Sequence, residues 1–128
     1  MRLLTKSQRK DIGLIRAELA KVKAPETLPE RAEIRSKANG WTRALATGQS
    51  FDSPWLAGAV GHIATIAQYC SSVEWWSQVD HVEGYAKMAS DNLQSAIEHD
   101  NEERRDRKWR SEQRDFERRL KAALGGDA

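Results

Sequence analysis

The sequence predicts an all-α protein, an antiparallel bundle of four or five helices with a buried central helix (residues 54–71) and a long charged C-terminal helix. Three observations predict this class. Apolar residues recur at three- and four-residue spacing, a Ser or Thr followed three residues later by Glu or Gln occurs at three expected helix starts, and no segment alternates like a strand. At 128 residues, the chain has room for one core.

The first helix is expected over residues 6–23. Thr5 and Gln8 match the capping box, in which two side chains satisfy backbone amides that the first turn leaves unpaired. The apolar residues around this segment share an arc of about 80° at 100° per residue: Leu4, Ile12, Ile15, Leu19 and Val22. This arc predicts one face against the core.

The second helix is expected to start at Thr27, which precedes Pro29 and Glu30. Its apolar stripe consists of Ile34, Ala38, Trp41 and Leu45. Because the stripe keeps its phase across Asn39-Gly40, we expect the helix to run through this glycine and to end near Gly48.

The third helix begins with a cap and a proline, Ser53-Pro54, and is apolar on nearly every side. Such a helix is typical of the interior of a bundle, so we expect it to be central. Cys70, the one cysteine of the chain, lies in this apolar pattern, which indicates a small core residue rather than a nucleophile.

The fourth helix is expected to open at Ser71 with Glu74. Its apolar stripe is Trp75, Val79, Val82, Ala86, Leu93 and Ile97. The next large apolar residues, Trp109, Phe116 and Leu120, would point to the opposite side of a straight helix. Two structures remain open: a break near residues 99–101, with Asp100 capping a fifth helix, or one long helix that projects from the bundle.

We therefore expect two parts, a bundle domain over residues 1–100 and a charged helix over residues 101–128 that projects or folds back. Ten residues from four helices are predicted to be buried together: Ile15, Leu19, Trp41, Leu45, Leu56, Ile63, Ile66, Val79, Val82 and Leu93.

Charge is unevenly distributed, although the net charge is only +2. Residues 1–23 carry seven basic and two acidic side chains, and residues 51–100 carry one basic and seven acidic side chains. In the C-terminal segment, basic residues share an arc of about 80°: Arg107, Arg110, Arg114, Arg118 and Lys121. We call this set the basic stripe. It suits phosphates or an acidic protein surface.

The competing interpretation of the basic stripe is a solvated helix face, and the sequence favours it. Acid precedes base at the favourable four-residue spacing in four pairs: Glu103–Arg107, Asp106–Arg110, Asp115–Arg119 and Glu117–Lys121.

Two apolar surfaces are candidates for protein contacts. Trp109, Phe116 and Leu120 approximate two heptads of a coiled-coil seam, which suits a partner helix, a second copy of the chain, or the protein's own core. Trp76 lies off the main stripe of the fourth helix, with Tyr85 and Met88, and together they are candidates for an exposed patch.

The sequence offers no catalytic constellation, no metal site and no cofactor motif. His62, His81 and His99 lack metal-ligand spacing, and no phosphate-binding glycine loop or nucleophile elbow occurs. Two acidic pairs, Glu30/Glu33 and Asp80/Glu83, leave one enzyme class open, an all-helical metal-dependent nucleotide hydrolase, although their order and flanks do not match that pattern.

We expect a non-enzymatic interaction protein, a regulator or inhibitor that occupies a partner's surface, where the partner is another protein such as one that handles nucleic acid. Similar small helical proteins are common among accessory proteins of phages and mobile elements, which is an association only. No export signal or membrane span is expected, so the cytoplasm is the expected location. The alternative is direct nucleic-acid binding through the stripe and Lys6, Arg9, Lys10 and Arg16.

Overall fold

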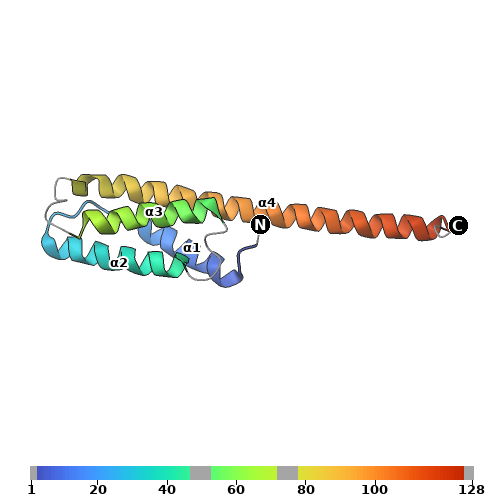
Figure 1. Ribbon diagram of the computed structural model, residues 1–128, viewed down its shortest axis with the longest axis horizontal. Helices are drawn as coiled ribbons and strands as arrows, with labels where there is room; N and C mark the ends of the chain where they lie inside the picture. The colour runs from blue at the N-terminus through green and yellow to red at the C-terminus, as the bar shows by residue number, and fades with distance from the viewer. Residues whose placement is uncertain (1–2, 47–52, 72–77, 126–128) are drawn as a thin grey trace.

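The computed structural model describes residues 3–46, 53–71 and 78–125. Its four helices are α1 (Lys6–Leu19), α2 (Leu28–Ala46), α3 (Pro54–Tyr69) and α4 (Val82–Ala123). Three of them and the first half of α4 form a bundle, and the second half of α4 projects as a rod (Figure 1). The predicted all-α bundle with a long C-terminal helix is confirmed.

Local capping explains why the first helices begin where they do. The Thr5 hydroxyl accepts the amide of Gln8 at 3.0 Å, and the Gln8 side chain accepts the amide of Thr5 at 2.8 Å. At α2, the Thr27 hydroxyl accepts the amide of Glu30 at 3.2 Å. The α2 helix continues through Gly40 as expected, whereas α1 ends at Leu19, earlier than the predicted residue 23.

Helix α3 packs between α2 and α4, in agreement with its predicted central place (Figure 1). Its start is capped by Ser53, whose hydroxyl accepts the amide of Leu56 at 3.3 Å. The sequence also offers a face of small residues on this helix for close helix packing, but its residues Gly61 and Ala64 are exposed. Gly58 instead provides the close approach, because a Cβ atom there would lie 2.7 Å from Nδ2 of Asn92 on α4.

Helix α4 runs without interruption for 42 residues, about 63 Å at 1.5 Å per residue. A 3₁₀ turn over residues 78–81 precedes it, so the α-helix starts at Val82 rather than next to Ser71. The predicted cap residue Glu74 and Trp75 lie outside the described residues. The alternative with a fifth helix is wrong, because α4 is helical through residues 99–101 and Asp100 caps nothing.

The core is one cluster to which all four helices contribute, and its least exposed large side chains include Ile12, Leu56, Ile63 and Leu93. Of the ten residues predicted to be buried, Trp41 is only partly buried at the edge, and Val79 is buried outside the main cluster. Cys70 is part of the core, and burial raises the pKa of its thiol. None of the described helices is long and apolar enough to span a membrane.

Candidate functional site

The most prominent surface is the rod, the part of α4 that lies beyond Arg104. Nearly all of its residues from 105 to 124 are exposed, and in Figure 1 no other element lies beside them. Its apolar side chains are also exposed: Trp109 by 61%, Phe116 by 55%, Leu120 by 47% and Leu124 by 75%. Of the two alternatives that the sequence leaves open, the structure has the projecting helix over these residues.

A buried carboxylate lies where the rod leaves the bundle. Asp100 Oδ1 accepts the backbone amide of Leu4 at 2.8 Å. Its Oδ2 accepts Arg9 Nη1 and, at 2.9 Å, Arg104 Nε. Arg104 Nη2 donates to the Leu4 carbonyl at 2.6 Å, and Arg9 Nη2 donates to Asn101 Oδ1 at 2.9 Å. We call this network the Asp100 clasp. It joins the segment before α1 to the base of the rod.

The charge of Asp100 is stabilised although its side chain is only 3% exposed. Burial raises the pKa of this carboxyl, but the hydrogen bonds from Arg104, Leu4 and Arg9 together outweigh that effect, and the pKa lies below its usual value. Sequence reasoning missed this role. The available signal was the position of Asp100 on the buried side of α4, seven residues after Leu93 and four after Ala96.

The basic stripe is exposed along the rod, as expected. Arg107 donates to Glu103 at 3.0 Å, and Arg110 contacts the same carboxylate at 3.5 Å. The hydrogen bond from Arg107 is the main reason why the pKa of Glu103 is lowered. Arg118 pairs with Asp115. Two acidic side chains thus neutralise part of the stripe.

Only one of the four predicted i,i+4 ion pairs forms, that of Glu103 with Arg107. Arg119 donates to the backbone carbonyl of Asp115 at 3.4 Å instead of its carboxylate. Across the described part of α4, Arg114 and Lys121 of the stripe form no ion pair, and neither do Glu112 and Glu117. Three of the four expected pairs are therefore absent from this part of the helix.

The second candidate patch is described only in part. Tyr85 lies half-buried against α3, with its ring 5.6 Å from Tyr69 and 5.9 Å from His62. Hydrogen bonding with Tyr85 is the main cause of a raised pKa for Tyr69. Met88 is exposed, and Trp76 lies outside the described residues. Two of the three side chains therefore occupy different environments.

The four candidate nucleic-acid residues on α1 differ in their exposure to solvent. Lys6 and Lys10 are exposed, whereas Arg9 and Arg16 are partly buried. Arg9 is held by Asp100 and Asn101, so its guanidinium group serves the Asp100 clasp. Arg9 reaches α4 at Asp100 and Asn101, before the first residue of the basic stripe.

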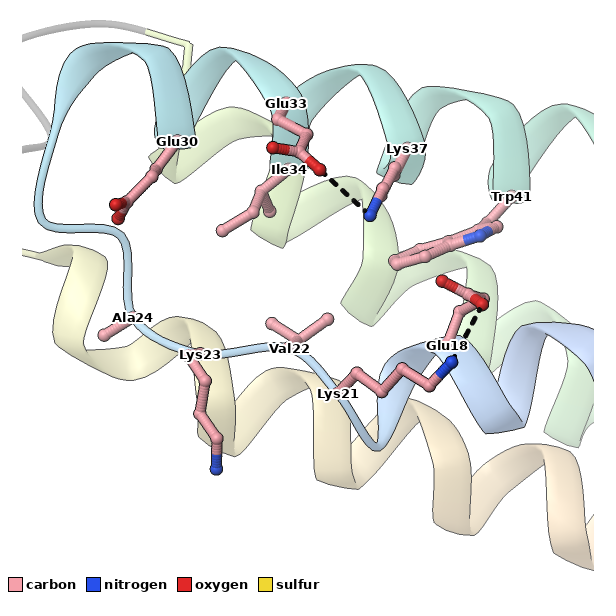
Figure 2. A pocket seen from close by; sticks show the side chains of 10 residues that line it. All are labelled: Glu18, Lys21, Val22, Lys23, Ala24, Glu30, Glu33, Ile34, Lys37 and Trp41. Atoms are coloured by element: carbon pink, nitrogen blue, oxygen red, sulfur yellow. Dashed lines mark ion pairs between the residues drawn. The ribbon is translucent and has the colours of Figure 1, made fainter.

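A hollow of about 240 Å³ lies between the end of α1, the following loop and α2 (Figure 2). Val22, Ile34 and Trp41 form its apolar lining. The charges around it are largely paired: Lys21 with Glu18 at 3.6 Å and Lys37 with Glu33 at 3.1 Å. Sequence reasoning did not find this hollow, because it arises where the apolar faces of α1 and α2 meet the loop between them.

Three carboxylates of the acidic pairs considered for metal binding have structural partners. Glu30 Oε2 accepts the amide of Glu26 at 2.8 Å, Glu33 pairs with Lys37, and Glu83 lies 3.9 Å from Lys23. In the parts of the chain that the structure describes, no three His, Cys, Asp or Glu side chains are grouped as metal ligands.

Comparisons with family models, with curated proteins and with solved structures find no match to this chain. The functional assignment therefore depends on the surfaces of the molecule.

Proposed function

We propose that this chain is a non-enzymatic interaction protein, a small regulator or inhibitor that binds an acidic surface of a partner protein through the basic stripe. The observation that carries this proposal is the position of the stripe on a helix that stands clear of the bundle. A helix in this position presents five basic side chains in a fixed spacing without competition from the bundle surface.

The charge arrangement supports a polyanionic partner. Arg114 and Lys121 form no ion pair within the described chain, and Arg118 is 78% exposed. Arginine binds carboxylates in a two-pronged geometry, which favours acidic protein surfaces and phosphates alike. A protein that handles nucleic acid and carries an acidic groove has the complementary surface. An accessory protein of a phage or mobile element, acting in the cytoplasm, fits this kind of function.

The test uses two variants with equal changes in net charge. In the stripe variant, Arg110, Arg114 and Arg118 are replaced by Glu. In the control variant, Arg35, Lys87 and Lys108 are replaced by Glu; these are exposed basic residues that lie off the stripe. A partner is captured with the parent chain from a nuclease-treated lysate, purified, and titrated against all three proteins.

We expect the stripe variant to bind at least about ten-fold more weakly than the parent, a loss of about 1.4 kcal/mol or more, and the control variant to bind nearly like the parent. Equal affinities of all three proteins would remove the stripe from the interface. Circular dichroism checks that both variants keep their helices, because surface substitutions usually change stability little.

Direct nucleic-acid binding is the alternative, and its salt dependence identifies it. A protein that neutralises phosphates releases counterions, so its affinity falls steeply as salt rises. A gel shift with duplex DNA and single-stranded RNA, titrated with salt, measures this slope. If the parent binds nucleic acid tightly and the stripe variant does not, the partner of the basic stripe is a nucleic acid and not an acidic protein. The apolar side of the rod is left for a second interface.

A further inference from the structure

We propose that two copies of this chain pair through their rods in antiparallel orientation, with Trp109 of one copy opposite Leu120 of the other. This inference does not rest on the acidic partner proposed above, because its apolar seam lies on the opposite side of the rod; of the basic stripe, Arg110 alone takes part in it. It rests on an apolar seam, on the charges that flank the seam, and on the length of the rod.

The seam faces away from the bundle. Trp109 lies nine positions after Asp100, which at 100° per residue places Trp109 about 180° around α4 from the buried side. Gln113, Phe116 and Leu120 lie within about 40° of Trp109. A second helix can therefore approach the seam without meeting α1, α2 or α3.

The seam is confined to the rod. Further back along the same side of α4, within the bundle, the exposed residues are polar or acidic: Asp91, Glu98 and Glu102. At its other end, α4 stops at Ala123, and Gly125 adopts a left-handed backbone with φ of 68°. The apolar contact surface thus extends from Trp109 to the last turn of the helix.

Seam residues alternate in the spacing of a coiled coil, with Trp109, Phe116 and Ala123 in one row and Gln113 and Leu120 in the other. In an antiparallel pair, residues of one row meet residues of the other. The register that places Trp109 opposite Leu120 also places Phe116 opposite Gln113. Each contact occurs twice because the pair has two-fold symmetry.

The flanking charges are complementary in this register. Arg110 of one copy faces Glu117 of the other, and Glu112 faces Arg119, so symmetry gives four attractive pairs. Glu112 and Glu117 form no ion pair within the described part of their own helix, which leaves both carboxylates available. Charges beside a seam are known to determine partner choice and orientation in coiled coils.

Other arrangements bring like charges together. A parallel pair in register places Arg105 beside Arg110 and Glu112 beside Glu117. An antiparallel shift by one heptad in one direction places Glu112 beside Glu112 and Arg110 beside Arg110. The shift by one heptad in the other direction places Arg119 beside Arg119 and Glu117 beside Glu117. Like charges in these positions are repulsive, so the charges select one register.

The length of the rod fits this register as well. Residue 105 of one copy lies opposite residue 124 of the other, so the end of each helix reaches the point where the other leaves its bundle. The overlap is 20 residues, about 30 Å. Such a short contact predicts a reversible dimer that forms as concentration rises, rather than an obligate one.

Charge reversal tests both the dimer and its orientation, with sedimentation velocity measured up to about 1 mM protein. We expect the parent to shift from monomer to dimer as concentration rises. In E112R, two attractive pairs become repulsive, and we expect the dissociation constant of the dimer to be at least about ten-fold larger than that of the parent. A parallel dimer would respond in the opposite direction, because the introduced guanidinium group would then face Glu117. A parent that stays monomeric, or tighter association of E112R, would overturn the proposal.

Two further proteins separate pairing from damage to the helix. R119E alone is expected to weaken the dimer, whereas the exchange E112R/R119E restores all four attractive pairs and is expected to dimerise like the parent. A mixture of E112R and R119E is expected to form a heterodimer that is tighter than the homodimer of either variant. Failure of the exchange or of the mixture, with helicity unchanged by circular dichroism, would overturn the register.

Discussion

Replacing Asp100 by alanine tests whether the Asp100 clasp stabilises the junction between the bundle and the rod. The substitution removes the acceptor for Leu4 N–H and for two guanidinium groups. The side chains of Arg9 and Arg104 are 32% and 44% exposed, so water can replace part of what they lose. The Leu4 amide is buried at this contact and loses its partner completely.

From these contacts we expect the free energy of unfolding of D100A to be about 2 to 4 kcal/mol lower than that of the parent. Hydrogen bonds to charged groups contribute about 1.5 to 3 kcal/mol each, and partial hydration of the arginines reduces their sum. Such a loss is a large part of the roughly 5 to 15 kcal/mol that holds a domain of this size together. The control is D91A, which removes an exposed aspartate from the same helix.

The pH dependence of D100N follows from the lowered pKa of Asp100. A carboxyl that is more acidic in the folded than in the unfolded state stabilises the fold above its unfolded pKa, about 3.9, and this contribution disappears as pH falls through the folded pKa. The stability difference between parent and D100N should therefore be constant near pH 7 and shrink below about pH 4.

Urea unfolding at 25 °C, followed by circular dichroism at several pH values, measures both effects. Stability of D100A within about 0.5 kcal/mol of D91A would show that the clasp contributes nothing, since that is the spread of ordinary surface changes. A difference between parent and D100N that persists unchanged at low pH would refute the role of the charge.

Three further predictions concern the packing of the bundle and the independence of the rod. I63A should lower the free energy of unfolding by about 2 to 5 kcal/mol, because Ile63 is fully buried; a urea curve like that of the parent would contradict its central place. Truncation after Arg105 should leave the unfolding free energy nearly unchanged, since the removed residues are exposed, and a large fall in melting temperature would show hidden contacts. G13A should stabilise the protein by about 0.5 to 1 kcal/mol, as its Cβ meets no atom within 4 Å, whereas G58A should gain less because its Cβ meets Asn92; equal gains in thermal melts would contradict the close approach.

Local signals made most of the bundle predictable from the sequence. The caps at Thr5, Thr27 and Ser53 act within three residues, so their hydrogen bonds follow from sequence order alone. The start of α4 was less predictable, because the 3₁₀ turn over residues 78–81 depends on how the chain passes from α3 to α4. Trp41 is only half-buried for a similar reason, since it lies at an edge beside the hollow.

The surfaces of the rod were predictable because helical periodicity places residues even without tertiary contacts. The pairing of its charges was not, since an exposed arginine has several acids within reach and Arg110 contacts Glu103 rather than Asp106. The Asp100 clasp was not predictable either. Burial of Asp100 depends on Leu4 and Arg9, which no local pattern connects to α4.

The Asp100 clasp also has a consequence for the order of folding during synthesis. Leu4 and Asp100 are 96 positions apart, so at 5 to 20 residues per second the Leu4 amide waits about 5 to 20 s before its acceptor has been made. Until then, Leu4 and Arg9 lack their acceptor, and α1 can pack only against the elements made before residue 100. The contact between the segment before α1 and Asp100 therefore forms late. The residues of the rod are synthesised only after this contact becomes possible.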